Sequence, residues 1–423
     1  MNDDPRLARV RNIVADVYAR NRQLGHAAWC NRDYDFVCPS TGTYPFQWLW
    51  DSCFHAVALS HLDVTRAKSE IDCLLANQSD DGLVSHVTFW QRARYEEMLE
   101  TYSIAYRTPY LSDCIQPPLV AESVAAIVAR GGDDAWLRAV LPKVRAFYDF
   151  LDRVRDPDRD GLIATLQPDE SGLDHTPKYD DYIGLGPVSH ANHTAAWERI
   201  TKAYAPAQLA SGRDTAKMFA IGKFVVEDVL VNVIYAENER VLADLYARVG
   251  DVSAANEMRA RSAKTEAAIL EKCWSEEHGL FFDLAGPEEK HLAVSTVSSL
   301  MPLMLPNLPA PKLAALVKHV EGDYKTTFPV PTVSLREPTF AEGPVDTKLV
   351  WRGPCWVNTN WYVARGLRRH GRDDLATWIE DQSVAMVEKS GLREYYNPHT
   401  GEGYGAEDFS WSGLALDMLS RPT

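Results

Sequence analysis

Apolar residues recur at the three- and four-residue spacing of an α-helix along most of the chain. In residues 5–24 this spacing is kept by Leu7, Val10, Ile13, Val14, Val17 and Tyr18. The same spacing predicts a helical segment that follows Tyr44–Asp51 to about Leu62, and further helices over residues 64–77, 117–130, 133–155, 189–210, 225–249, 251–274, 291–304, 310–320, 354–370, 372–388 and 409–420. Strand patterns are few, with short strands expected only at residues 281–283 and 332–334. The chain is therefore predicted to be all-α.

A glycine–leucine pair recurs after several of the predicted helix pairs. It stands at residues 161–162, 279–280 and 391–392, with a looser copy at 82–83. Repeated helix–turn–helix units of this kind stack as antiparallel pairs, and about a dozen helices close into an α/α toroid with its loops on one rim. The alternative is that these glycines only cap helix ends. Because no linker-like stretch divides the chain, we expect a single domain over residues 1–423.

Charge and composition narrow the functional classes. The net charge of −15 argues against binding to nucleic acid or to an anionic membrane surface. Seven cysteines without a CxxC pair suggest neither a disulfide framework nor a zinc site, and the histidines lack zinc-ligand spacing. The first residues do not resemble a signal peptide, and no apolar run approaches the length of a membrane span. We therefore expect a cytoplasmic globular protein that needs no metal or cofactor.

Two acidic stretches, far apart in the chain, could carry chemistry. Residues 167–174 hold three carboxylates after a turn signal, and residues 393–398 hold Glu394. Hydrolysis of an acetal needs one carboxylic acid to protonate the leaving oxygen and one carboxylate to activate water or attack carbon. The pattern also fits helix capping or a solvated surface, and Asp51 could serve only the N-terminal dipole of its helix. Composition does not decide which carboxylate is the acid.

Tryptophan gathers in three short stretches that also contain polar residues. The six tryptophans in them are Trp48, Trp50, Trp351, Trp356, Trp361 and Trp411. An aromatic face beside fixed hydrogen-bonding groups suits a sugar ring, which has apolar faces and a hydroxyl rim. Packing in the core is an equally good interpretation for any one of them. We favour a sugar-binding role for Trp48 and Trp351.

Taken together, the motifs resemble glycoside hydrolase family 63. They are Tyr44-x-x-Gln47-Trp48-x-Trp50-Asp51, Glu170-Ser171-Gly172-Leu173-Asp174, Trp351-Arg352-Gly353-Pro354-x-Trp356, Glu394-Tyr395 and Phe409-Ser410-Trp411-Ser412. They follow the order of the family and span residues 44–412. The chain looks most like the small bacterial members, which hydrolyse mannosylglycerate or glucosylglycerate, with trehalases as more distant kin. The resemblance implies an (α/α)6 barrel and an inverting α-glycosidase.

The resemblance also assigns residues. It implies that Asp174 is the general acid and Glu394 the general base, with roughly 6.5–9.5 Å between the two carboxyl groups. The residues that it places around the substrate are Tyr44, Gln47, Trp48, Trp50, Asp51, Gln116, Glu170, Gly172, Trp351, Arg352, Trp356 and Trp411. One position departs from the family, because the glycerate enzymes have glutamine where this chain has Phe409, which would favour a less polar leaving group.

The predicted function is therefore hydrolysis of a small α-glucoside or α-mannoside with inversion. A glucosylglycerate or mannosylglycerate hydrolase proper is the alternative within enzymes, and a catalytically inactive carbohydrate-binding toroid is the alternative from another class. A small carbohydrate is the expected partner, and assembly into a homo-oligomer is left open.

Overall fold

A computed structural model describes most of the chain. The described residues are 5–92, 106–108, 110–185, 195–196, 199, 215–222, 224–343 and 350–420. Most of the helix expected at residues 189–210 lies outside them.

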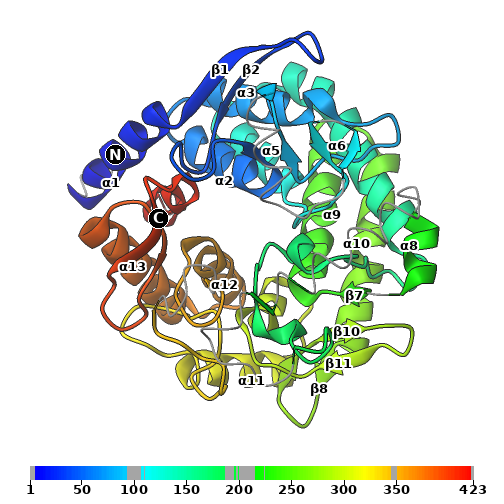
Figure 1. Ribbon diagram of the computed structural model, residues 1–423, viewed down its shortest axis with the longest axis vertical. Helices are drawn as coiled ribbons and strands as arrows, with labels where there is room; N and C mark the ends of the chain where they lie inside the picture. The colour runs from blue at the N-terminus through cyan, green and yellow to red at the C-terminus, as the bar shows by residue number, and fades with distance from the viewer. Residues whose placement is uncertain are drawn as a thin grey trace.

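An inner ring of helical segments closes on itself (Figure 1). Its members are α2 (Leu49–Ser60), α5 (Val120–Ala129), α9 (Val229–Arg248), η4 (Val297–Met304), α12 (Val357–Arg369) and η5 (Ser410–Leu414), which continues into α14 (Ala415–Leu419). Each member contacts the next, and η5 returns to α2. The prediction of an (α/α)6 barrel is thereby confirmed.

A second layer of helices covers this ring from outside. It consists of α3 (Val64–Leu74), α6 (Asp134–Arg155), α10 (Val252–Lys272), α11 (Ala310–Glu321), α13 (Asp373–Ser390) and α1 (Pro5–Arg20), with the short α8 (Thr215–Ile221) beside α6. The starts of three outer helices are set by aspartate N-caps, Asp63, Asp133 and Asp251, whose side chains accept hydrogen bonds from backbone N–H groups of the first turn.

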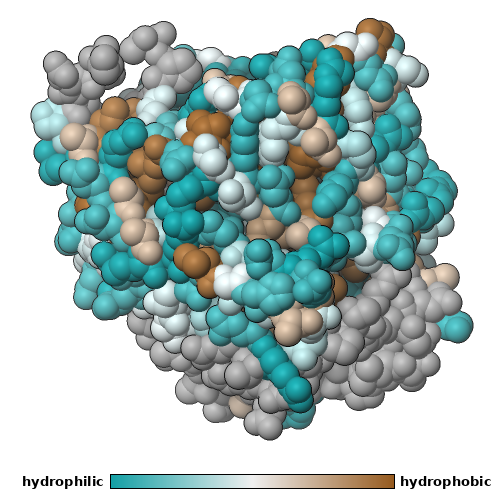
Figure 2. All heavy atoms as spheres, turned by 90° about the horizontal axis from the view of Figure 1, so that it is seen from above, coloured by the Kyte–Doolittle hydropathy of each residue, from teal (hydrophilic) through white to brown (hydrophobic). Residues whose placement is uncertain are grey.

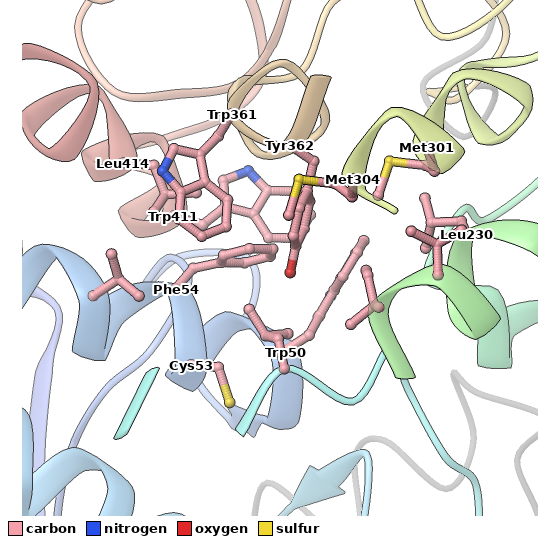
Figure 3. Close-up of a cluster of buried hydrophobic side chains, with 14 of the residues drawn as sticks. Trp50, Cys53, Phe54, Leu230, Met301, Met304, Trp361, Tyr362, Trp411 and Leu414 are labelled. Carbon is pink, nitrogen blue, oxygen red and sulfur yellow. The ribbon is translucent and has the colours of Figure 1, made fainter. Parts of the chain in front are cut away.

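The two layers differ in how they are buried. Every residue of α2 is buried, whereas α1 buries only one face, through Val10, Val14, Val17 and Tyr18. A helix that is covered on all sides is apolar over most of its circumference and must find partners for its polar residues inside the protein, whereas one at the surface needs only an apolar stripe. Inside the ring, Trp50, Phe54, Trp361, Tyr362 and Trp411 come together from α2, α12 and η5 (Figure 3). From above, the surface is mostly hydrophilic, with apolar side chains scattered between polar ones (Figure 2).

Short antiparallel strands lie in the loops between helices. They are β1 (Arg22–Ala27) with β2 (Arg32–Val37); β3 (Gln47–Trp48), β4 (Val87–Thr88), β6 (Leu111–Ser112) and β5 (Tyr106–Thr108); β7 (Val226–Glu227), β10 (Asp283–Ala285) and β11 (Lys290–Leu292); β8 (Trp274–Ser275) with β9 (Leu280–Phe281); and β12 (Arg393–Tyr396) with β13 (Gly403–Glu407). Three short 3-10 turns, η1 (Leu75–Asn77), η2 (Pro168–Ser171) and η3 (Pro177–Tyr179), complete the loops. Strands β3 and β12 carry residues of the predicted site.

The glycines of the repeated pairs share a positive φ. Gly82, Gly161, Gly279 and Gly391 each follow an outer helix or its last turn, and all have positive φ. Glycine adopts this left-handed backbone without steric cost. The repeat is therefore structural, since four outer helices, α3, α6, α10 and α13, are each followed by such a glycine. The expectation of one domain stays a prediction, although one core cluster runs from Val10 to Met418.

Three sequence-based boundaries were wrong. The first helix ends at Arg20, because the buried side chain of Asn21 donates to the carbonyls of Pro39 and Asp408 and the chain then enters β1. The expected helix at 291–304 is a 3-10 segment that starts only at Val297. It contains Pro302, which lacks the N–H that an α-helix requires.

The third wrong prediction concerns the two expected strands, residues 281–283 and 332–334. Val333 forms only an isolated bridge with Thr296, and the apolar run at 281–283 is divided between β9 and β10.

Two further findings bear on the predictions made from composition. All seven cysteines are free thiols. Within the described part of the chain, no helix is long and apolar enough to cross a membrane.

Candidate active site

Asp174 lies in a loop that leaves the rim after α6, residues 167–180, here called the Asp174 loop. η2 ends at Gly172, whose φ is +73°, and a Cβ at this position would lie 2.7 Å from the Trp50 ring. Only glycine allows the loop to pack this closely on α2 in that conformation. The Asp174 side chain two residues later is exposed. Gly172 thus allows the loop to pack against Trp50 of α2, and this packing holds Asp174 next to the inner ring.

Glu170 anchors the start of the Asp174 loop. Its two carboxylate oxygens accept from both terminal nitrogens of Arg155, at 2.7 and 2.8 Å, and from the backbone N–H groups of Ile115 and Leu166. Both Glu170 and Arg155 are buried. A bidentate pair with two further donors satisfies the carboxylate fully. Glu170 therefore fixes the loop, and the expectation that it contacts the sugar is not supported by this geometry.

Arg352 anchors the other end of the Asp174 loop. Its Nε donates to the His175 carbonyl at 2.8 Å, and its terminal nitrogens donate to the two oxygens of Asp180 at 2.9 and 2.6 Å. His175 has a φ of 62°, an unfavourable conformation for a residue with a side chain. Arg352 is almost fully buried. Its contacts hold the strained residue next to Asp174, so we assign it a positioning role.

A buried lysine fastens the same loop to α9. Lys178 Nζ pairs with Asp228, lies 2.9 Å from Asp283 and donates to Ser298 at 3.0 Å. Asp228 is also the N-cap of α9, where it accepts from the N–H of Val231. The loop is therefore tied to several elements of the inner layer.

Glu394 lies at an irregularity between β12 and β13. Between the pairs Arg393–Glu407 and Tyr395–Tyr404, β13 has one residue more than β12. Such a bulge redirects side chains and frees backbone groups from the ladder. The freed N–H of Ala406 donates to Glu394 Oε2 at 2.8 Å.

Two further residues complete the surroundings of Glu394. The Tyr44 hydroxyl donates to Glu394 Oε1 at 3.1 Å. Gly405 has a φ of +68°, and a Cβ there would lie 2.4 Å from Glu394 Oε2. Each carboxylate oxygen therefore has one donor, and the close approach of β13 requires glycine.

The carboxyl groups of Asp174, Glu394 and Asp51 lie close enough that the pKa of Asp174 depends on Glu394 and Asp51, and the pKa of Asp51 depends on Glu394. Burial, followed by repulsion from Asp169, Glu394 and Asp51, raises the pKa of Asp174 well above its usual value. Burial and repulsion from Glu394 and Glu70 likewise raise the pKa of Asp51, against a backbone hydrogen bond that lowers it. Burial raises the pKa of Glu394, while the donors Ala406 N–H and Tyr44 oppose the rise.

Asp174 combines solvent access with poor solvation. Its side chain is exposed by surface area, yet burial is the main cause of its raised pKa. The two observations agree if the carboxyl lines a recess, where water reaches it but protein atoms displace most of the bulk solvent. A group so placed can meet a ligand and still hold its proton at a pH where an ordinary aspartate would not.

Four tryptophans, Trp50, Trp351, Trp356 and Trp411, pack against one another and form what we call the tryptophan wall. Trp351 stacks on Trp356 with ring centroids 3.8 Å apart, and Trp411 meets Trp50 and Trp356 edge-on at 5.1 and 5.3 Å. These four rings are only 1–4% exposed, which leaves them little surface to offer a sugar. Trp48 is only partly buried. Of the tryptophans expected to contact substrate, Trp48 therefore keeps part of its surface accessible, and Trp50, Trp351, Trp356 and Trp411 form the wall.

Gln47 and Gln116 hold the start of α2. Gln47 Oε1 accepts from the indole N–H of Trp90 at 2.8 Å, and its Nε2 lies 3.3 Å from Ser52 Oγ. Gln116 Oε1 accepts from the backbone N–H of Trp50 at 3.2 Å. Both glutamines are buried. Their contacts position the helix turn that carries Asp51.

Sequence reasoning missed several residues that build this site. Arg155, Lys178 and Asp180 position the Asp174 loop, but no local pattern distinguishes a buried charge from a surface one. Gly405 had a weak signal, because glycines alternate in Gly403-Tyr404-Gly405 shortly after Glu394. By contrast, the structure does bring Tyr44, Asp51, Asp174 and Glu394 to one place.

Comparison with known proteins agrees with this geometry. Residues 44–412 match the family described as the mannosylglycerate hydrolase MGH1-like glycoside hydrolase domain. The mannosylglycerate hydrolase of Thermus thermophilus is 32% identical over 409 residues, which cover 90% of this chain and 96% of that protein. The glucosylglycerate hydrolase of Mycolicibacterium hassiacum is 26% identical over 445 residues, which cover 93% of this chain and 96% of that protein.

A solved structure gives the same result. A family 63 mannosylglycerate hydrolase from Thermus thermophilus, in complex with Tris and D-glycerate, superimposes with a TM-score of 0.83 at 29% identity, over 97% of this chain and 100% of that one. The chain therefore belongs to the mannosylglycerate hydrolase MGH1-like family within glycoside hydrolase family 63, and it is an enzyme that cleaves glycosidic bonds.

Proposed function

We propose that the enzyme hydrolyses a small α-glycoside with inversion, using Asp174 as general acid and Glu394 as general base. The observation that carries this assignment is the contrast between the two carboxyls. Burial and three neighbouring carboxylates raise the pKa of Asp174 well above its usual value. Burial also raises the pKa of Glu394, but hydrogen bonds from Tyr44 and Ala406 oppose this rise and favour the ionised form. Two coupled groups whose environments differ in this way divide into a proton donor and a proton acceptor.

The chemical steps follow from these protonation states. Asp174 gives its proton to the glycosidic oxygen as the bond to the anomeric carbon breaks. Glu394 removes a proton from a water molecule whose oxygen attacks the same carbon from the opposite face. The products are a free sugar with inverted configuration and an alcohol, and the proton gained by Glu394 later returns to Asp174 through solvent. Asp51, buried beside both groups, is suited to accept hydrogen bonds from sugar hydroxyls.

For the substrate, we propose an α-mannoside or α-glucoside with a small aglycone. Mannosylglycerate and glucosylglycerate are the leading candidates, because relatives that match over nearly their whole length carry those names. A small carbohydrate is the only partner that this reaction requires.

One residue favours a second candidate within the same class. The ring of Phe409 lies 5.8 Å from that of Tyr44 and 4.9 Å from that of Trp411, edge-on to both. It places a hydrocarbon surface next to the tyrosine that contacts Glu394. Phe409 is itself only 3% exposed, so it would act mainly by offering no polar group where the glycerate enzymes have glutamine, and this would favour an aglycone that is less polar than glycerate.

Substrates with different leaving groups test the two catalytic roles. The fluoride ion of an α-glycosyl fluoride leaves without being protonated, whereas the leaving oxygen of an alkyl glycoside needs a proton from the general acid. We expect Asp174→Asn to lose about 10²–10⁴-fold in kcat on the alkyl glycoside but far less on the fluoride. Glu394→Gln should lose activity on both. As a control, Asp181→Asn changes an exposed carboxylate of the neighbouring turn and should leave both rates unchanged.

The pattern of loss decides the assignment. Equal losses of Asp174→Asn on both substrates would contradict its role as acid. Full activity of Glu394→Gln on either substrate would exclude it as the base. Circular dichroism of each variant separates a loss of chemistry from a loss of fold.

The aglycone is tested separately by comparing kcat/KM for mannosylglycerate, glucosylglycerate and uncharged α-disaccharides. A preference for the glycerates would establish them as substrates, and Phe409→Gln should then raise their kcat/KM. A preference for uncharged aglycones, reduced in Phe409→Gln, would support the second candidate.

A further inference from the structure

Four carboxylates converge where the loop after α6 meets β7 and the β10–β11 turn. Ligand atoms of Asp158, Asp160, Glu227 and Glu289 all lie within 4.8 Å of one another. They come from three separate segments, namely the loop after α6, strand β7 and the turn between β10 and β11. Among the described residues, this is the group of acidic side chains whose spacing suits a metal ion. We call it the four-carboxylate cluster.

The cluster has less positive charge than its carboxylates require. Lys272, at the end of α10, pairs with Asp160 and Glu289 at 2.6 Å each, and it provides one positive charge against four carboxyl groups. Lys272 therefore compensates the cluster only in part.

Glu227 supplies an independent observation. It is only 8% exposed, and its Oε2 is fully buried without a hydrogen-bond donor from any described residue. A buried acceptor without a partner costs free energy, because it gives up its bonds to water. Glu227 is also one of the four groups that meet in the cluster. A cation bound by the Glu227 carboxylate would give this side chain a partner that the described residues do not supply.

The sequence around the cluster has the spacing of a known type of cation-binding loop. Asp156-x-Asp158-x-Asp160-Gly161 matches the first six positions of the calcium loop pattern Asp-x-Asp-x-Asp-Gly. The twelfth position of that pattern is a bidentate glutamate, and here it is Gln167. Glu227 and Glu289, which approach from elsewhere in the chain, offer carboxylates in its place.

We propose that the four-carboxylate cluster binds a hard divalent cation, Ca²⁺ in preference to Mg²⁺, outside the active site. Carboxylates suit hard cations, and ligands from three separate segments fit the irregular geometry that Ca²⁺ accepts better than the strict octahedron of Mg²⁺. Our expectation of no metal considered zinc and histidine spacing, so an oxygen-ligand site of this kind escaped it.

The site would connect distant parts of the barrel to the Asp174 loop. Strand β7, which carries Glu227, forms a bridge from Val226 to Thr165, and residue 165 lies between the cluster and η2. A cation there fastens the loop after α6 to β7 and to the β10–β11 turn. It thereby stabilises the segment from which the Asp174 loop departs.

Calorimetric titration of the chelator-treated full-length enzyme with CaCl₂ tests the proposal, with MgCl₂ as the second arm. We expect saturable binding of Ca²⁺ with a Kd of about 1 mM or tighter, weaker binding of Mg²⁺, and a rise in Tm on adding Ca²⁺. Absence of saturable Ca²⁺ binding at about 10 mM would overturn the proposal. Binding of Mg²⁺ as tightly as Ca²⁺ would overturn the assignment of the ion.

Variants locate the ion. Glu227→Gln removes a ligand charge but keeps the shape of the side chain, so Ca²⁺ affinity should fall by about tenfold or more. Lys272→Gln removes the competing cation and should tighten binding. Glu277→Gln changes an exposed carboxylate outside the cluster and should have no effect. Unchanged affinity in both Glu227→Gln and Lys272→Gln would place the ion elsewhere and contradict the proposal.

Discussion

The hydroxyl of Tyr44 is one of two donors to Glu394, and it acts against the burial that raises the pKa of this carboxyl. Removing it in Tyr44→Phe should raise the pKa of Glu394 further. A base must be ionised to work, so the acidic limb of the pH–rate profile should move to higher pH, by about 0.5–1 unit for a hydrogen bond of about 1 kcal/mol.

The measurement is kcat against pH for the wild type, Tyr44→Phe and a matched control. The control is Tyr404→Phe, which removes the hydroxyl of a tyrosine on β13. That hydroxyl contacts Asn397 and Glu402 and not the carboxylate of Glu394. We expect its acidic limb to coincide with that of the wild type. An unmoved acidic limb in Tyr44→Phe would mean that Glu394 does not govern it.

Individual residues also separate what a motif can and cannot predict. Tyr44, Asp51, Asp174 and Glu394 stand in motifs that resemble the family, and the structure brings them together. Glu170 and Arg352 stand in the same motifs, but their polar groups are bound within the protein. A motif records that a residue matters to the site, and it does not say whether the side chain faces the ligand or supports a neighbour.

At the level of elements, the β12–β13 bulge sets the position of Glu394. Gly405→Ala would place a Cβ 2.4 Å from Glu394 Oε2, in a backbone conformation that alanine rarely adopts. The carboxylate must then move, and a displaced catalytic group costs on the order of 10²-fold in rate. We expect a loss of kcat of this size in a protein that remains folded.

Gly371→Ala is the matched control for the backbone. Its φ of +73° resembles that of Gly405, but a Cβ there would meet no atom within 4 Å. Both variants bear the cost of a positive φ, and Gly405→Ala should lose more thermal stability because its Cβ also lies 2.5 Å from Tyr395 Cε1. Only Gly405→Ala should lose activity. Equal activities in the two variants would contradict the importance of the bulge.

Elements were predictable where they follow their own local pattern. The outer helices α3, α6, α10 and α13 lie within a few residues of their expected ranges, because an apolar stripe defines each of them and an aspartate N-cap starts α3, α6 and α10. The short strands at the rim were missed, since pairs of two to six residues depend on partners distant in sequence. η4 was expected to be an α-helix, and Pro302 is the local signal that could have corrected this.

At the level of the whole molecule, Glu122 joins three inner helices. Its carboxylate on α5 lies 2.8 Å from Arg365 on α12, and it accepts from Asn238 on α9 at 2.9 Å and from Tyr362 at 3.1 Å. Breaking a fully buried pair costs about 3–5 kcal/mol. Since the Arg365 side chain is 32% exposed, we expect less for Glu122→Ala, about 2–3 kcal/mol of the free energy of unfolding.

Denaturant unfolding of Glu122→Ala and Glu321→Ala measures this difference. Glu321 pairs with Arg372 at the surface, where an ion pair contributes about 0–1 kcal/mol. If both variants lose the same small amount, the buried network does not hold the inner ring together. The closure of the ring itself was predictable from the repeated helix pairs, but no sequence signal identified the polar contacts between its inner helices.

The central claim is that a water molecule held by Glu394 attacks the anomeric carbon from the face opposite to the oxygen protonated by Asp174. Proton NMR of the sugar released from an α-glycoside, recorded before mutarotation, tests it most directly. We predict that the β-anomer is released first and that the signal of the α-anomer increases only later, through mutarotation. An α-anomer formed first would show retention of configuration and would contradict the mechanism.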